Sequence, residues 1–313
     1  MFFFRTDDSR DVESFWKRMQ EPDTASSIVI GFVLLLVLAA AVLGIWAVVG
    51  LPAQMKEQDE QTFRELQRSF LQYKLAADTL RIQGNYDAAV GIILPQTQGL
   101  TFRVVTDTGG KLSIVTDDDF GNSTTVRIGR VSAEVSGFSG ERSVVTYESG
   151  GIHIRTGDGN PAWTTPALLQ ISPGEPAAAR IEIGIISFAE NAEISGNGHL
   201  PVTMMLQESA ARTLYWKDNA TIQFHSPDAE QRKLWETVFF ETKERIVIGP
   251  DVRIRRPDSS TIVVQTKNEI PLLTIRQTDP LTLRLETKTN TTLSEVILRE
   301  AVYATGPAEI IHT

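Results

Sequence analysis

The chain has 313 residues, no cysteine and a formal net charge of −9. The absence of cysteine excludes disulfides, thiolate metal sites and cysteine nucleophiles. The acidic balance argues against nucleic acid as a partner, because nucleic-acid binding requires a basic surface. Hydrophobic residues make up 42% of the chain, so the part outside a membrane segment can bury a core.

Residues 1–25 form a charged leader, which we expect to be cytoplasmic, and a long apolar stretch follows it. No charged side chain occurs from Ile28 to Leu51. A membrane-spanning helix needs about 20 residues, whereas the apolar part of a secretory signal usually has about 7–15. We therefore predict a retained transmembrane helix at 26–51, with the lipid bilayer as its first partner.

Small residues within this stretch would let neighbouring helices approach closely, although they are also common in membrane helices that have no such role. The small residues that we assign to a membrane or assembly helix are Gly31, Ala40 and Gly44. Pro52 follows at the predicted membrane exit. Because proline lacks an N–H group and crowds the preceding turn, we expect it to kink or break the helix there.

Residues 52–84 have the pattern of an amphipathic helix that continues the span. Apolar side chains recur at helical spacing, with charged residues between them, at Phe63, Leu66, Phe70, Tyr73, Ala77 and Leu80. This period predicts one helical face that packs at least partly onto the chain's own domain.

From about residue 90 the hydrophobic period changes to two, with glycine-rich turns between short segments such as KLSIVTD and TTVRIG. The pattern predicts β-strands over 90–225. One helix should interrupt them at 227–245, with Ser226 as its N-cap and Pro227 in its first turn. Its apolar face would dock on a sheet or, alternatively, bind a partner. Residues 226–313 hold this helix and further strands, in the same subdomain or a second one.

The predicted fold class is therefore α+β. A long N-terminal transmembrane-plus-amphipathic helix precedes a mainly antiparallel, β-sandwich-like domain with one inserted helix. Lysine and arginine are nearly balanced on the two sides of the span, so the positive-inside rule does not orient it. Three N-x-S/T sequons, at Asn122, Asn219 and Asn290, are glycosylation candidates. They favour a cytoplasmic N-terminus and an extracellular C-terminal domain.

Motifs that would carry chemistry are scarce in this sequence. The four histidines, none of them in a metal-binding motif, are His153, His199, His225 and His312. There is no nucleophile elbow and no P-loop. We therefore predict no catalytic residue, no cofactor and no enzymatic activity. A cluster of histidines or carboxylates with perturbed pKa values in one cleft of the folded domain would favour a membrane-tethered enzyme instead.

The most acidic loop is TDDDFGN at 116–122, where Asp117, Asp119 and Asn122 offer oxygen atoms to Ca²⁺. Its spacing does not fit an EF-hand loop, and a hairpin turn between two strands explains the same residues. We therefore favour the turn and predict no metal site. The basic stretch RIRR at 253–256 is more typical of a solvated edge strand than of a nucleic-acid site.

Several segments carry a family resemblance. SSIVIG at 26–31 opens the single apolar helix, and the segments VVGLPAQMKEQDEQTFRELQRSFLQYK, VTYESGGIHI and AEISGNGHLPVTM come after it. In these the chain resembles archaeal type IV pilin-like proteins and a related uncharacterised archaeal family of single-span membrane proteins. Thr24 and Ala25 stand where such leaders have a basic residue and a small one, and Ile28 stands where they have proline. Cleavage of the leader therefore stays open.

The resemblance implies a non-enzymatic cell-surface protein, which would act as a filament subunit, a minor pilin, or a surface scaffold or adhesion protein. Other pilin-like subunits would be its partners through the N-terminal helix. The alternative is a static anchored ectodomain that binds a ligand or the cell envelope.

Overall fold

The structure of the protein is a computed structural model. It describes residues 22–84, 89–116, 123–137, 140–173, 179–246, 251–287 and 293–307. The chain divides into two compact units, Met1–Gln58 and Asp59–Thr313. Most of the predicted leader, residues 1–21, lies outside the described residues.

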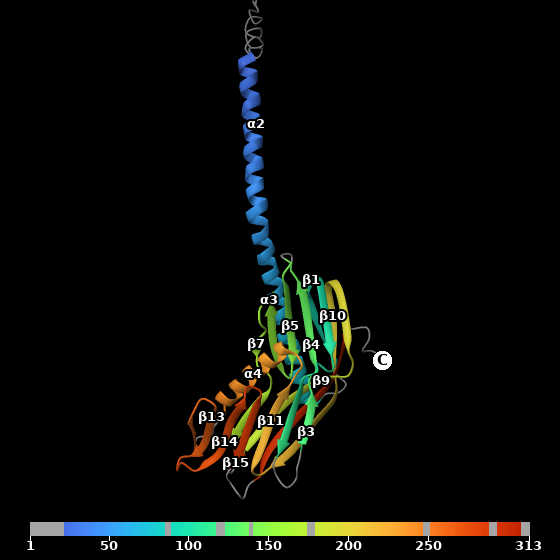
Figure 1. Cartoon of the computed structure of the whole chain (residues 1–313). Helices are drawn as coiled ribbons and strands as arrows, with labels where there is room; N and C mark the ends of the chain where they lie inside the picture. Colours follow the sequence, from blue (N-terminus) through green and yellow to red (C-terminus); the bar gives the residue numbers. More distant parts are fainter. Residues whose placement is uncertain are drawn as a thin grey trace, which may run out of the picture. The chain divides into compact units, whose positions relative to one another are not determined.

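The first unit is helical (Figure 1). It contains α2 (Pro22–Ile45), a five-residue π-helix η1 (Trp46–Gly50) and the beginning of α3 (Leu51–Gln83). Every described side chain from Val29 to Val49 is exposed. Among the described residues, one helix is long and apolar enough to cross a membrane, and it is the helix of this unit. The mean hydropathy of its apolar part is 3.0.

The predicted break at Pro52 does not occur, because helical structure continues through this residue in α3. The turn directly before it is widened instead. The backbone N–H of Leu51 donates to the carbonyl oxygen of Trp46, five residues back, as in a π-helix. The wider turn relieves the crowding that a proline ring imposes on the preceding turn of an α-helix.

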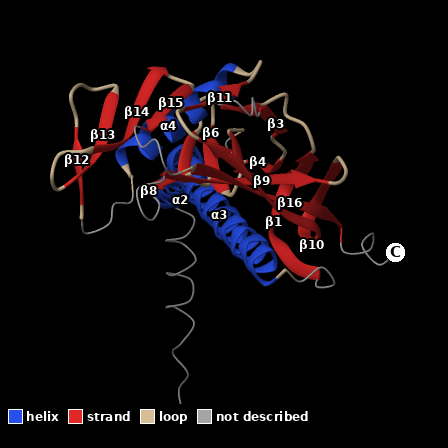
Figure 2. Ribbon diagram, turned by 90° about the horizontal axis from the view of Figure 1, so that it is seen from below, coloured by secondary structure: helices blue, strands red, loops and turns tan. Residues whose placement is uncertain are grey.

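The second unit contains two β-sheets and one further helix (Figures 1 and 2). The nine-stranded sheet, called the large sheet below, has its strands in the spatial order β7 (Ala162–Thr165), β6 (Gly151–Thr156), β5 (Arg142–Glu148), β4 (Arg130–Ser136), β1 (Ala89–Val105), β10 (Ala192–Trp216), β16 (Ser294–Pro307), β9 (Ala179–Phe188) and β8 (Leu169–Pro173). Its neighbours pair antiparallel except β16 and β9, which are parallel.

The seven-stranded sheet, called the small sheet, is antiparallel. Its order is β12 (Val252–Arg255), β13 (Thr261–Thr266), β14 (Pro271–Asp279), β15 (Thr282–Thr287), β11 (Asn219–His225), β2 (Lys111–Thr116) and β3 (Ser123–Arg127). Both sheets contain strands from before and after the inserted helix, so the described strands of residues 226–313 belong to the same two sheets as the strands before them. The RIRR stretch begins in β12, an edge strand, as predicted.

α3 covers one face of the large sheet with the apolar stripe that the sequence predicts (Figure 2). Leu66, Phe70, Tyr73, Ala77 and Leu80 are buried there, while Phe63 is partly buried. Two hydrogen bonds join the helix to β16. The Tyr303 hydroxyl donates to the carbonyl oxygen of Ala77 at 2.6 Å, and the hydroxyls of Tyr73 and Thr305 lie 2.7 Å apart.

The inserted helix, α4 (Ala229–Glu244), packs against a second core made by the small sheet and by β8, β9 and β16. Its side chains Leu234, Trp235, Val238 and Phe239 are buried, so the predicted docking on a sheet occurs. The predicted cap is wrong, however. Asp228, and not Ser226, is the N-cap, because its carboxylate accepts from the N–H groups of Glu230 and Gln231.

Candidate functional site: a polar cleft beside Glu148 and His153

The predicted site residues of the first unit lie along its helix. Gly31, Ala40 and Gly44 belong to α2 and Pro52 to α3, and all of them are exposed. A Cβ atom built at Gly31 or Gly44 would meet no other atom within 4 Å. The space beside both glycines is therefore open.

The structure describes only some of the candidate residues that the sequence places in loops. Asp117, Asp119, Asn122 and Asn290 lie outside the described residues. The strands that flank 117–122, β2 and β3, pair as antiparallel neighbours, as expected for a hairpin. Asn219, the remaining sequon, is the half-buried first residue of β11 and pairs with Glu286.

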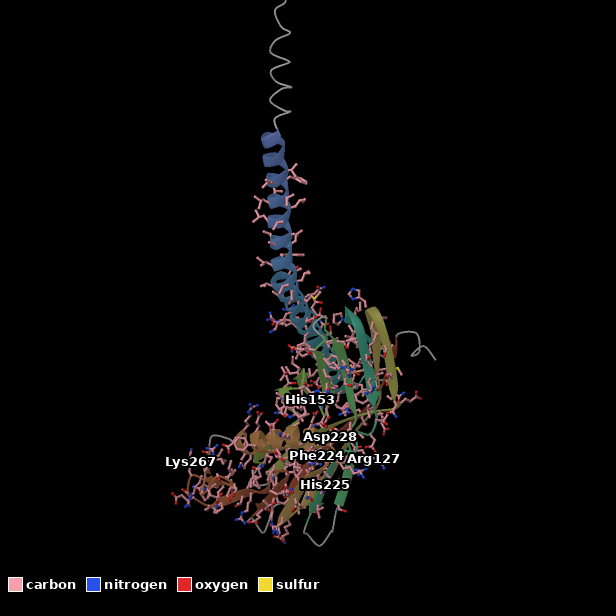
Figure 3. All side chains as sticks on the ribbon, turned by 45° about the horizontal axis from the view of Figure 1, so that its top comes forward. Arg127, His153, Phe224, His225, Asp228 and Lys267 are labelled. Carbon is pink, nitrogen blue, oxygen red and sulfur yellow. The ribbon has the colours of Figure 1, made fainter. Side chains whose placement is uncertain are left out.

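A polar cleft lies where the large sheet meets the N-terminus of α4, and its volume is about 190 Å³. Figure 3 marks His153 and Asp228, two of its lining residues. The cleft is on the sheet face opposite α3, because its floor residues alternate along each strand with residues buried under that helix. Its lining comprises Arg103, Arg130, Ser132, Glu134, Val144, Thr146, Glu148, His153, Arg155, Pro161, Asp228, Glu230, Gln231 and Leu234.

A tight hairpin between β5 and β6 sets the register of the cleft floor. Its two loop residues, Ser149 and Gly150, have φ values of 47° and 79°, as in the two-residue turns that favour glycine. The register places Thr146 opposite His153, and Glu148 opposite Gly151. A Cβ atom at Gly151 would come within 2.6 Å of the backbone of the segment after β7, so the glycine permits a close approach of two chain segments.

Glu148 is fully buried at the inner end of the cleft. Its Oε1 accepts hydrogen bonds from Nε1 of Trp235 at 2.8 Å and from Nε2 of Gln231 at 3.0 Å, both on α4. The Trp235 ring stacks on Phe224, with centroids 4.5 Å apart. Gln231 is held by a further bond to Thr108. One carboxylate thus joins the helix to the large sheet.

The other carboxylate oxygen of Glu148 faces His153. Oε2 lies 3.9 Å from Nε2 of the imidazole, which is longer than a hydrogen bond. Both atoms are buried, and neither has a hydrogen-bond partner among the described residues. The imidazole lies edge-on to the Trp163 ring, with centroids 5.1 Å apart.

Glu148 is ionised at neutral pH. Burial acts to raise its pKa, but the nearby His153 and the hydrogen bonds from Trp235 and Gln231 outweigh burial and hold the pKa below its ordinary value of 4.5. The Glu148 carboxylate therefore brings a negative charge to the buried end of the cleft.

The charged groups around the cleft differ in how far they are already paired. Arg155 binds Glu230 at 2.9 Å, and Arg103 binds Glu193 at 3.0 Å. Asp228 caps α4. Arg130 is half-buried and forms no ion pair with any other described residue. The groups left for a ligand are thus the Arg130 guanidinium, the Glu148 Oε2 atom and the His153 Nε2 atom.

These groups are suited to binding more than to metal chemistry. Across the described part of the chain, no three His, Cys, Asp or Glu side chains are close enough together to hold a metal ion. The perturbed Glu148 carboxylate beside His153 is a cluster of the kind named above as favouring a membrane-tethered enzyme. The same two side chains can also hold a polar ligand by hydrogen bonds.

Sequence reasoning missed this site, because it treated His153 as an isolated histidine and did not consider Glu148. A signal was present in ESGGIH. A two-residue turn at Ser149 and Gly150, combined with strand alternation, brings Glu148, Thr146 and His153 onto one face. What the sequence does not show is the arrival of α4, whose Gln231 and Trp235 lie 83 and 87 residues further along the chain.

Comparison with protein-family models, with curated proteins and with solved structures found no match to this chain. The structure itself defines the class: an α+β protein with one N-terminal helix able to span a membrane and a mostly antiparallel β-rich unit.

Proposed function

We propose that the chain is a non-enzymatic, single-span, pilin-like protein of the cell surface. Its N-terminus is cytoplasmic and its β-rich unit is extracellular. The observation that carries the proposal is the apolar helix, whose described side chains from Val29 to Val49 are all exposed. Apolar surface of this extent is unfavourable in water, at roughly 25 cal/mol per Å². A lipid bilayer, or a bundle of like helices, removes it from water.

The continuation of the helix supports the pilin-like form of the proposal. The second half of α3 packs its apolar stripe onto the large sheet, so the anchor segment and the β-rich unit share an element of secondary structure. The small residues Gly31, Ala40 and Gly44 would let the helices of neighbouring subunits approach closely. The role would then be that of a filament subunit, a minor pilin, or a surface scaffold or adhesion protein.

A second function is favoured by the cleft. A static anchored ectodomain that binds a ligand or the cell envelope needs a concave site with unsatisfied polar groups. Glu148, His153 and Arg130 provide such groups. This function does not require filament assembly or cleavage of the leader.

The test is the mature N-terminus, determined by mass spectrometry of the full chain from native membranes. A terminus at or near Ser26 supports pilin-type processing and the filament role. An intact leader supports a permanent anchor and the second function. In parallel, protease added to intact cells should digest the β-rich unit. Digestion that occurs only after the cells are opened would refute the extracellular orientation.

A further inference from the structure

We propose that the cleft binds a sugar acid, a uronic acid either free or as a unit of an acidic polysaccharide. A ring hydroxyl lies between Glu148 and His153, and the ligand's carboxylate lies on Arg130. The proposal builds on the surface role above by naming a ligand class. Binding needs neither processing of the leader nor filament assembly, so the two proposals fail in different experiments.

The hydroxyl follows from the two buried atoms that face each other. A hydroxyl can donate to the Glu148 carboxylate, which only accepts, and can accept from His153 in the form that carries a proton on Nε2. An ammonium group cannot accept and a carboxylate cannot donate. With oxygen–oxygen and nitrogen–oxygen hydrogen bonds of about 2.8 Å, a single oxygen atom spans the 3.9 Å gap.

The carboxylate follows from Arg130. This residue is directly opposite Glu148 in the pairing of β4 with β5, so their Cβ atoms lie about 5 Å apart on the same face. The other two arginines of the cleft already bind glutamates. A free, half-buried guanidinium is well suited to a carboxylate, because its planar fork offers two parallel hydrogen bonds.

The size and polarity of the cleft favour a single sugar ring. Its volume of about 190 Å³ is below the roughly 300–1,000 Å³ of pockets for drug-sized ligands. The hydroxyls of Ser132 and Thr146 lie on the floor between Arg103 and His153, so further ring hydroxyls have partners.

A divalent cation fits less well. Two ligands of a tetrahedral metal, each about 2.0–2.2 Å from it, would lie roughly 3.4 Å apart. The two cleft atoms are 3.9 Å apart, and a third ligand of the usual kind is absent from the described residues.

The test is saturation-transfer difference NMR on the full chain in detergent micelles. The probes are sodium glucuronate, sodium galacturonate and a short oligogalacturonide, with glucose and galactose as neutral controls. The variants are Arg130→Gln and His153→Gln. Arg253→Gln, at an exposed arginine of the edge strand β12 without an ion pair among the described residues, is the matched control. Circular dichroism checks that each variant is folded.

We expect at least one uronate to bind, and the neutral sugars to bind more weakly. Arg130→Gln should weaken uronate binding about tenfold or more, as loss of a charge-assisted hydrogen bond does. It should also reduce the difference in affinity between uronates and neutral sugars. Arg253→Gln should change nothing. If the oligogalacturonide binds more tightly than galacturonate, the ligand is a unit of a polysaccharide. If the two bind equally, the ligand is a free sugar acid. No binding of any uronate at tens of millimolar, or binding that Arg130→Gln leaves intact, would overturn the proposal. His153→Gln separates the two contacts, since it should lower affinity for uronates and neutral sugars alike.

Discussion

The buried carboxylate of Glu148 should contribute more to stability through the donors that it satisfies than through its charge. Glu148→Leu leaves Nε1 of Trp235 without an acceptor, which costs about 1–3 kcal/mol. Gln231 loses its hydrogen bond to Glu148 but keeps the one to Thr108, so its contribution to the lost free energy is smaller. We therefore expect the free energy of unfolding to fall by about 2–4 kcal/mol.

Glu148→Gln keeps an oxygen atom in the position of Oε1, removes the negative charge and replaces Oε2 with an uncharged NH2 group. Its cost should be about 1–2 kcal/mol, the difference between charged and neutral hydrogen bonds. The exposed Glu193, which pairs with Arg103 at the surface, provides a control. Glu193→Gln should change stability by less than about 1 kcal/mol.

The carboxylate also predicts a pH dependence. The pKa of Glu148 is lower in the folded chain than its ordinary value of 4.5. Its stabilisation is therefore present above pH 4.5 and is lost as the pH falls through the folded-state value. Glu148→Gln lacks this titration, so the stability difference between wild type and variant should shrink on acidification.

The assay is urea denaturation of the full chain in detergent micelles, followed by tryptophan fluorescence at neutral pH and at several values below 4.5. If the Glu148→Leu variant is as stable as the Glu148→Gln variant at neutral pH, the role of the buried donors is refuted. A wild-type advantage over Glu148→Gln that stays constant into acid would refute the assigned titration.

Three other changes test the packing and the anchor. Phe70→Ala, at a side chain only 1% exposed, should lower the free energy of unfolding by about 3–5 kcal/mol. Its control, Leu71→Ala at a 39% exposed side chain, should lower it by less than about 1 kcal/mol. Equal losses would contradict the packing of α3. Gly151→Ala forces a Cβ atom to within 2.6 Å of backbone and should cost about 1–3 kcal/mol in the same urea assay, whereas Gly196→Ala, with nothing within 4 Å, should be far milder. Leu38→Arg should disfavour membrane insertion by about 3 kcal/mol relative to Leu38→Ala. Insertion is measured as the fraction of the protein that stays with the membranes after carbonate extraction. Unchanged insertion would argue against a spanning helix.

The elements of the fold could be predicted because their patterns are local. The spacing from Leu66 to Leu80 is enough to identify the buried face of α3, since a helix puts residues three and four apart on one side. The apolar side chains of α4 follow the same rule. Its first residue was misplaced because Ser226 and Asp228 are both good caps, and backbone geometry alone decides between them.

The site could not be predicted because it depends on contacts between distant segments. Glu148 ends an alternating strand and would ordinarily be read as a solvated residue. Its burial requires that Gln231 and Trp235 come to it on α4, and that Phe224 of the small sheet supports the Trp235 ring. The behaviour of Pro52 likewise depends on the π-turn at Trp46–Gly50, which hydrophobic periodicity does not reveal.

The position of β16 has a consequence for when the chain can fold. This strand, Ser294–Pro307, lies inside the large sheet between β10 and β9, both of which precede it by many residues. The sheet stays divided into two parts until residue 307 has left the ribosome and, in an exported chain, has also crossed the membrane. Contacts of such long sequence separation form slowly. Late closure would keep the β-rich unit in a translocation-competent, unfolded form during export, and would leave a chain that stalls before β16 open to proteolytic quality control.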